Sequence, residues 1–316
     1  MFRYTIQRII FMLPVALLVS FMTFMLIHLI PGDPATVLLG EEATPQTVAA
    51  LQKELGLDKP LLVQFGLWLW QAVHGNLGDS IQLHQPVTQA LMQRLPVTVE
   101  LGLASLLFSL VLAIPLGVYS ATHRHGWIDW LVNTFSLLGT AIPSFVLALI
   151  LIYFFAVYWR PFPPGGYVPL IDEPVDNLRD LVLPMIALGA GTVAVNLRQV
   201  RASVTEALEQ DYVRTARAKG LSDWRVNYVH AFRNALVPLV TIVGLQIGAV
   251  LGGAFVIETI FLWPGVGALA IQSIFSKDYP VIQGVVLLVA FSYMLTNLLV
   301  DLSYPFFDPR IRLNKS

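Results

Sequence analysis

The chain has 316 residues, of which 56% are hydrophobic and only 12% are charged, and its mean hydropathy is +0.70. Its 19 basic and 20 acidic side chains nearly cancel, so the charge gives no sign of nucleic acid as a partner. The lack of cysteine excludes disulfides, thiolate metal ligands and cysteine nucleophiles.

Six runs contain no Asp, Glu, Lys or Arg, and each approaches or exceeds the roughly 20 residues that a helix needs to cross a bilayer. We therefore expect an all-α integral membrane protein, with one domain over residues 1–316. The predicted spans are residues 9–30, 101–123, 131–158, 181–200, 236–257 and 281–302. The first run is too long for a signal-peptide core and lacks a small-x-small cleavage pattern, so it should remain as a span.

Between the spans, residues 31–100 should form an extracytoplasmic segment with short helices, one of which begins at Thr44 and Pro45. Residues 124–129 predict a cytoplasmic turn and 160–180 an irregular outer loop. If the amino terminus is cytoplasmic, 13 of the 19 basic residues lie on the inner side. This excess predicts that both termini face the cytoplasm.

Polar residues and glycines within the spans have more than one interpretation. His28, Glu258 and Asp301 lie near predicted span ends, where water or headgroups can reach them. Asn133, Asn196 and Gln246 are expected to make hydrogen bonds between helices. One helical face of the fifth span has glycines at intervals of four, namely Gly244, Gly248 and Gly252. They predict close helix packing, either within this bundle or against a second membrane subunit.

The polar insert 201–235 separates the fourth and fifth spans. We predict that residues 201–219 extend the fourth span as a helix that Gly220 stops. A second short helix should follow, with Ser222 as its cap and Asp223 in its first turn. Its narrow apolar stripe consists of Leu221, Trp224, Tyr228 and Phe232. Headgroups, the ends of the spans or a groove on another protein could cover this stripe, and the pattern alone does not decide.

The run DYVRTARAKGLSDWRVNYVHAFRNALVPLVT, at 211–241, resembles the cytoplasmic signature of inner-membrane permeases of binding-protein-dependent ABC importers. The similarity is to the branch that handles dipeptides, oligopeptides, nickel and glutathione. Further matching blocks, which extend the resemblance over nearly the whole chain, include HLIPGDPA at 28–35, ETIFLWPGVG at 258–267 and DYPVIQG at 278–284. Arg214, Thr215 and Ala216 replace the Glu-Ala-Ala of the wider superfamily, as is typical of the peptide branch.

The resemblance implies a type I importer fold, the MetI-like permease fold, whose short helix after the signature glycine is a coupling helix that docks on a cytoplasmic ATPase. The coupling residues that it implies here are Arg214, Ala216, Gly220, Leu221, Ser222, Trp224, Arg225, Tyr228, His230, Phe232 and Arg233. The implied partners are a second homologous permease, two ATPase subunits, an extracytoplasmic solute-binding protein and the lipid bilayer of a bacterial inner membrane.

No phosphate-binding loop of the form G-x-x-x-x-G-K-[ST] is present, so we expect ATP and Mg²⁺ on the partner ATPases and no cofactor on this chain. Motifs of metalloproteases and serine hydrolases are also missing, which predicts a subunit without catalytic activity. Two alternatives remain. An ion-coupled secondary transporter would need a buried ionisable relay, and a membrane scaffold would use the insert only to recruit a partner. Which solute is carried stays open.

Overall fold

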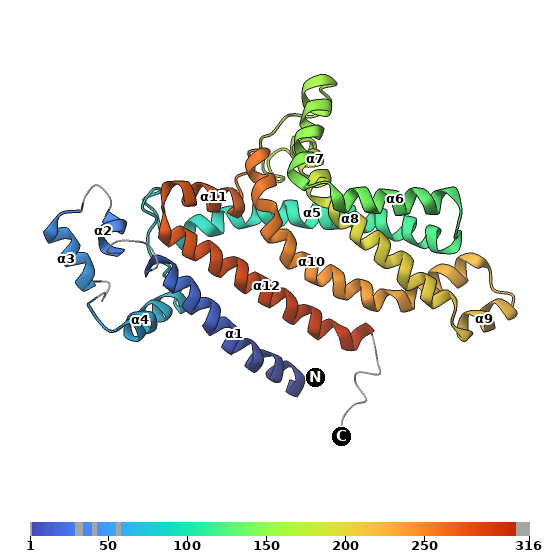
Figure 1. Ribbon diagram of the computed structural model, residues 1–316, viewed down its shortest axis with the longest axis horizontal. Coiled ribbons are helices and arrows are strands. Elements are labelled where there is room, and N and C mark those ends of the chain that lie inside the picture. The colour runs from blue at the N-terminus through green and yellow to red at the C-terminus, as the bar shows by residue number, and fades with distance from the viewer. Residues whose placement is uncertain (1, 29–33, 40–42, 55–57, 308–316) are drawn as a thin grey trace. The chain divides into compact units, whose positions relative to one another are not determined.

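The computed structural model describes residues 2–28, 34–39, 43–54 and 58–307 (Figure 1). These residues form helices and no strand; one isolated bridge joins Asp79 and Pro86. The chain divides into two compact units, Met1–Val97 with Pro264–Met294, and Thr98–Trp263 with Leu295–Ser316. Two long helices, α5 (Val87–Thr122) and α12 (Tyr279–Phe307), each begin in the first unit and continue into the second.

The first unit contains α1 (Phe2–His28), α2 (Pro34–Leu39), α3 (Pro45–Glu54), α4 (Leu61–Val73) and α11 (Val266–Ser276). Aromatic side chains join α1 to α4, because Phe24 lies within 5.7 Å of the ring centroids of Phe65 and Trp68. At the end of α1, His28 Nε2 lies 3.0 Å from Gln64 Oε1. This contact gives the predicted boundary residue a partner within the protein.

A buried carboxylate fixes the irregular chain that precedes α5. Asp278, only 1% exposed, lies between α11 and α12, and its Oδ2 accepts hydrogen bonds from Ser80 Oγ at 2.5 Å and from the Gln82 backbone N–H at 3.1 Å. Ser80 Oγ in turn accepts the Leu83 N–H at 2.8 Å. One acidic side chain thereby accepts hydrogen bonds from donors in a non-helical segment, which have no helical carbonyl as a partner.

The second unit is built around α8 (Pro174–Leu208), which contacts α6 (Trp127–Ala141), α7 (Ser144–Leu151) and α10 (Phe232–Ile260) (Figure 1). Small residues bring its neighbours close. A Cβ on Gly117 of α5 would lie 2.8 Å from Val200, and one on Gly139 of α6 would lie 2.9 Å from Ala194. Such contacts replace the hydrophobic effect, which lipid does not supply between helices.

The predicted span 131–158 contains a sharp bend: the chain turns by 102° between α6 and the helical pair α7 and η2 (Ile152–Tyr158). Pro143 causes the break. Proline has no N–H to donate, and it drives the preceding residue out of the helical region. Ile142 accordingly adopts φ −86° and ψ 118°.

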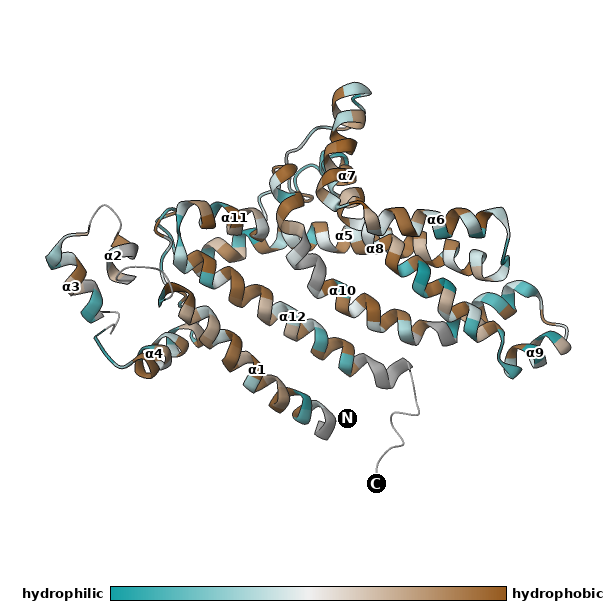
Figure 2. Cartoon of the chain, viewed as in Figure 1, coloured by the Kyte–Doolittle hydropathy of each residue, from teal (hydrophilic) through white to brown (hydrophobic). Residues whose placement is uncertain are grey.

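Among the described residues, four helices are long and apolar enough to cross a membrane, and the bent pair would make a fifth. They are Thr5–His28, Val87–Thr122, Pro174–Leu208 and Tyr279–Leu302. The fifth predicted span, 236–257, falls in α10, where several side chains lie outside the described residues and the fully described apolar stretch is Pro238–Gly248. Apolar residues follow α1 and α6, as Figure 2 shows, and many of their side chains are exposed, which suits a lipid surround.

Replacing Asp278 should destabilise the first unit. Asp278→Ala leaves the Ser80 hydroxyl and the Gln82 N–H without their acceptor, which should cost about 1–3 kcal/mol in the free energy of unfolding. Thermal unfolding of the detergent-solubilised protein measures the loss. Asp79→Asn, at an exposed neighbouring carboxylate, serves as the control. Equal stability of the two variants would contradict the role given to Asp278.

Candidate functional site

The insert between α8 and α10 begins with a break that the sequence analysis did not predict. The helix expected over 201–219 is two helices, because α8 ends at Leu208 and α9 covers Asp211–Ala218. Gln210 between them is extended, with φ −75° and ψ 150°. Asp211 favours a new helix start, since an acidic side chain in the first turn interacts well with the helix dipole.

Gly220 ends α9, as predicted. Its φ is +75°, which only glycine adopts without strain. The Gly220 N–H bonds to the Arg217 carbonyl at 2.9 Å, and the Leu221 N–H bonds to the Ala216 carbonyl at 3.3 Å. This pair of bonds is the Schellman motif, and it satisfies carbonyls that the end of the helix leaves free. The direction of the chain after α9 is therefore fixed by backbone geometry.

The segment after Gly220 joins α10 without a break. The π-helix η3 (Arg225–Ala231) continues into α10, and the Phe232 N–H bonds to the Asn227 carbonyl five residues back. This wider turn changes which side chains face inward. Val226, which the predicted stripe did not include, is fully buried against Val213 and Ala216 of α9.

The four residues of the predicted stripe have different surroundings. Leu221 packs beside Val226, and Tyr228 and Phe232 pack on a second apolar cluster formed by α5, α8 and α10. Trp224 remains 65% exposed, and its ring stacks on Tyr228 with centroids 5.8 Å apart. An exposed tryptophan, stacked on a half-buried tyrosine, therefore lies on a segment whose other side packs through buried valine and alanine.

The remaining predicted coupling residues surround this pair on the same segment. Ala216 is buried, and the exposed positions are Arg214, Ser222, Arg225 and Arg233. Arg214 lies 3.7 Å from Asp211 in an exposed ion pair within α9. The side chain of His230 lies outside the described residues. The structure thus gathers these residues along one insert, and their role in coupling stays a prediction.

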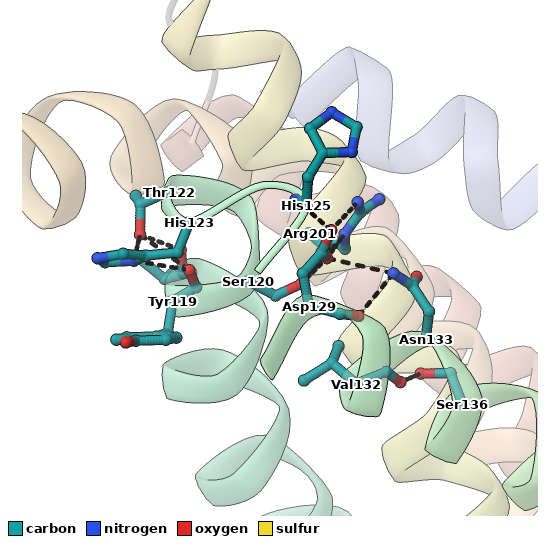
Figure 3. A network of polar contacts seen from close by, with 11 residues as sticks. Tyr119, Ser120, Thr122, His123, His125, Asp129, Val132, Asn133, Ser136 and Arg201 are labelled. Atoms are coloured by element: carbon teal, nitrogen blue, oxygen red, sulfur yellow. Dashed lines mark hydrogen bonds and ion pairs between the residues drawn. The ribbon is translucent and has the colours of Figure 1, made fainter. Parts of the chain in front are cut away.

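A charged junction lies where α5, α6 and α8 meet, and the sequence analysis missed it (Figure 3). Asp129 is 5% exposed and accepts two hydrogen bonds from Arg201, with Nε at 2.7 Å and a terminal nitrogen at 3.0 Å. Its carboxylate also accepts from Ser120 Oγ at 2.5 Å and from the His125 N–H at 3.1 Å. Asn133 bonds to Asp129 of its own helix, so its predicted bond between helices is not the one observed.

A second polar cluster lies in the same unit, around the loop before α8. Glu100 accepts hydrogen bonds from the Tyr167 hydroxyl at 3.0 Å and from Asn177 Nδ2 at 2.7 Å. Burial and the bond to Glu100 raise the pKa of Tyr167 to about 12, so the phenol remains a donor at physiological pH. Glu258 is fully buried and accepts from Thr98 Oγ1 at 2.6 Å, so the expectation that water reaches Glu258 was wrong.

The other polar predictions have mixed outcomes. Asn196 Nδ2 donates to Ser109 Oγ at 2.9 Å, which confirms a bond between α8 and α5. Gln246 has a buried Oε1 with no partner among the described residues. Asp301 is half-buried.

The three glycines of α10 do not share one environment. A Cβ on Gly244 would collide with Val300 of α12, so this glycine packs within the chain. Gly248 is buried, whereas Gly252 is exposed and has nothing within 4 Å of an added Cβ. The packing interpretation thus holds for Gly244, and the face around Gly252 is open.

A matched pair of substitutions tests this difference. Gly244→Leu should destabilise the protein by about 1–3 kcal/mol or more, since overpacking against Val300 forces the helices apart. Gly252→Leu, on the same helix, should unfold like the native chain. Thermal unfolding in detergent compares them. A Gly244→Leu protein as stable as the Gly252 variant would contradict close packing of α10 on α12.

Two family models cover most of the chain. Residues 113–313 match the binding-protein-dependent transport system inner membrane component, and residues 1–102 match the amino-terminal membrane component of such systems. A Brucella abortus protein provisionally named a peptide transport system permease protein is 43% identical, over 97% of this chain and 98% of its own length. The dipeptide transport system permease protein of Escherichia coli K12 is 39% identical over the full length of both chains.

A solved structure supports the fold independently of close sequence similarity. The methionine ABC transporter MetNI in inward-facing conformations matches with a TM-score of 0.57 and 18% identity, over 70% of this chain and 97% of that chain. This similarity confirms the predicted MetI-like permease fold. With its long apolar helices and family models that match both parts of its length, the chain belongs to the inner membrane components of binding-protein-dependent transport systems, the non-catalytic permease subunits of ABC importers.

Proposed function

We propose that this permease imports dipeptides or oligopeptides and that ATP hydrolysis on partner subunits drives it through the segment around Trp224. The relatives named above support the cargo class, because they are 39–43% identical along nearly the whole chain and their names specify peptides or dipeptides. A related small solute, such as a nickel complex or glutathione, would need a different binding protein with a similar permease.

One observation favours the docking role most. Trp224 is a large aromatic residue, 65% exposed, stacked on Tyr228 and flanked by the polar residues Ser222, Asp223 and Arg225. Charged neighbours make hydrocarbon an unfavourable surround for this ring. An aromatic centre with a polar rim is typical of protein interfaces, where tryptophan and tyrosine often dominate the binding energy. A groove on a cytoplasmic ATPase is therefore the proposed partner surface.

The segment around Trp224 is also packed tightly enough to pass movement on to the spans. Val226 and Ala231 are both fully buried, one against α9 and the other in the cluster with Val118 and Val204. Gly220 fixes the direction of the chain on one side, and η3 runs without interruption into α10 on the other. Movement of Trp224 should therefore move α10, since little in between can bend.

We infer the remaining assembly from this placement and from the family resemblance. An extracytoplasmic solute-binding protein would deliver cargo to the outer segments 31–100 and 160–180. A second, homologous permease would complete the path, and the open face of α10 around Gly252 is one surface it could contact. Two ATPase subunits would hold ATP and Mg²⁺ on the cytoplasmic side of a bacterial inner membrane, with both termini of this chain on that side.

A charge at Trp224 should abolish assembly with the ATPase. Trp224→Asp removes the aromatic anchor, and losing a residue of this kind weakens an interface by about 30-fold or more. The test is co-purification of the tagged permease with the ATPase from membranes. Trp224→Phe keeps an aromatic ring and should keep most of the association. Undiminished co-purification of the aspartate variant, inserted at normal levels, would rule out docking through this residue.

The proposed orientation can be read by labelling, because the native chain has no cysteine. A cysteine at Ser222 should react with a membrane-impermeant maleimide only in inside-out vesicles. A cysteine at Ile171, which is 93% exposed in the loop before α8, should react only in intact spheroplasts. The opposite pattern would place the Trp224 segment away from any cytoplasmic ATPase.

A further inference from the structure

The charged junction at Asp129 joins four parts of the second unit through one carboxylate (Figure 3). Its partners are Ser120 at the end of α5, the His125 backbone in the following loop, Asn133 in α6 and Arg201 in α8. The guanidinium meets both carboxylate oxygens, and its Nε also lies 3.1 Å from Ser120 Oγ. A two-point contact of this kind fixes orientation as well as distance.

A second ion pair joins the end of α8 to the loop between α5 and α6. Arg124, in the loop between α5 and α6, bonds to Glu209 at 2.9 Å and to the Thr205 carbonyl at 3.0 Å. Arg201 and Glu209 are eight residues apart, or about 12 Å along a helix axis. Two ion pairs at that separation restrain the tilt of α8 against the α5–α6 hairpin, whereas a single ion pair would leave the helix free to tilt about it.

The same stretch of α8 leads directly to the segment around Trp224, residues 221–232, which we call the docking segment. Glu209 is the last residue before the turn into α9, and Val200, Val204 and Ala207 pack with Ala231 of η3. On its other side, Gly117 lets α5 lie so close that an added Cβ would be 2.8 Å from Val200. The two ion pairs and the apolar cluster thus hold opposite sides of the same end of α8.

Stability alone does not require charges here. A buried ion pair seldom stabilises more than well-packed apolar residues of similar volume, because desolvation offsets the attraction. What the pair adds is a defined geometry between α6 and α8. Movement that begins at Trp224 needs this geometry to reach the spans. If α8 could tilt freely against α5 and α6, the movement would be lost at the contact between these helices.

We propose that Asp129 and Arg201, assisted by Arg124 and Glu209, are positioning residues for energy coupling: they hold the end of α8 rigid against α5 and α6, so that movement of the docking segment reorients the spans. This inference rests on the proposed docking of the ATPase at Trp224. It assigns the two residues no contact with cargo or nucleotide.

The test uses the complete transporter reconstituted in liposomes, with a fluorescent label on Ile171→Cys to report movement at the far end of α8. ATP with vanadate should change the label signal in the otherwise native protein. Arg201→Lys keeps the charge but loses the two-point contact. The variant permease should still bind the ATPase, and the assembled transporter should hydrolyse ATP, while the vanadate-induced signal falls by about tenfold. Asp129→Asn with Arg201→Gln, which keeps hydrogen bonding without charge, should fold normally and show the same loss.

Arg179→Gln is the control, because Arg179 forms an exposed pair with Asp176 at the other end of α8. A native-sized signal in both Arg201 variants would overturn the proposal and leave a purely structural pair. Should Arg201→Lys fail to fold, Arg124→Gln replaces it in the test. This variant loses only the exposed ion pair with Glu209; a reduced vanadate-induced signal supports the proposal, and a native-sized signal overturns it. The readout requires no cargo, so an error in the peptide assignment does not affect it. A native protein without any signal would overturn both this inference and the docking proposal.

Discussion

The second unit depends on one buried carboxylate, that of Asp129, and the first unit repeats its chemistry at Asp278. Each accepts a serine hydroxyl, from Ser120 or Ser80, and a backbone N–H from a segment that is not helical, at His125 or Gln82. The bilayer explains why such sites matter. Helices satisfy their own backbone in hydrocarbon, and wherever the chain leaves a helix near the membrane another acceptor must be supplied.

This constraint also explains how a permease can be rigid where it receives force and adaptable elsewhere. ATP energy reaches the spans only if the ATPase binds their two arrangements with different affinity, and only if the connection between them is stiff. The Gly220 turn, the buried Val226 and the junction at Asp129 supply stiffness by three different means: backbone geometry, apolar packing and a charged contact. The exposed Trp224 is then a large aromatic side chain of this segment left for a partner.

Sequence patterns predicted the features that are local and left out those that depend on distant residues. Runs without charge indicated the spans, and a glycine followed by a new apolar stripe indicated the stop at Gly220. The bend at Pro143 had a visible cause, but the apolar run continues across it. Val226 could not be recognised, since a π-helix changes which residues face inward. Asp129 and Arg201 are 72 residues apart, and nothing near either of them in the sequence specifies the other.

The way helices meet in lipid suggests why the charged pair lies where it does. Glycine contacts such as Gly117 against Val200 let two helices approach, but smooth surfaces without side chains allow sliding and rotation. A two-point contact between Arg201 and Asp129 removes that freedom beside the end of α8 that leads to the docking segment. Elsewhere along α8 the contacts with α5 and α6 are made by glycines and by single hydrogen bonds such as that from Asn196 to Ser109, which fix orientation less than a two-point contact does. Transport requires some freedom between helices, because the path must open to each side of the membrane in turn.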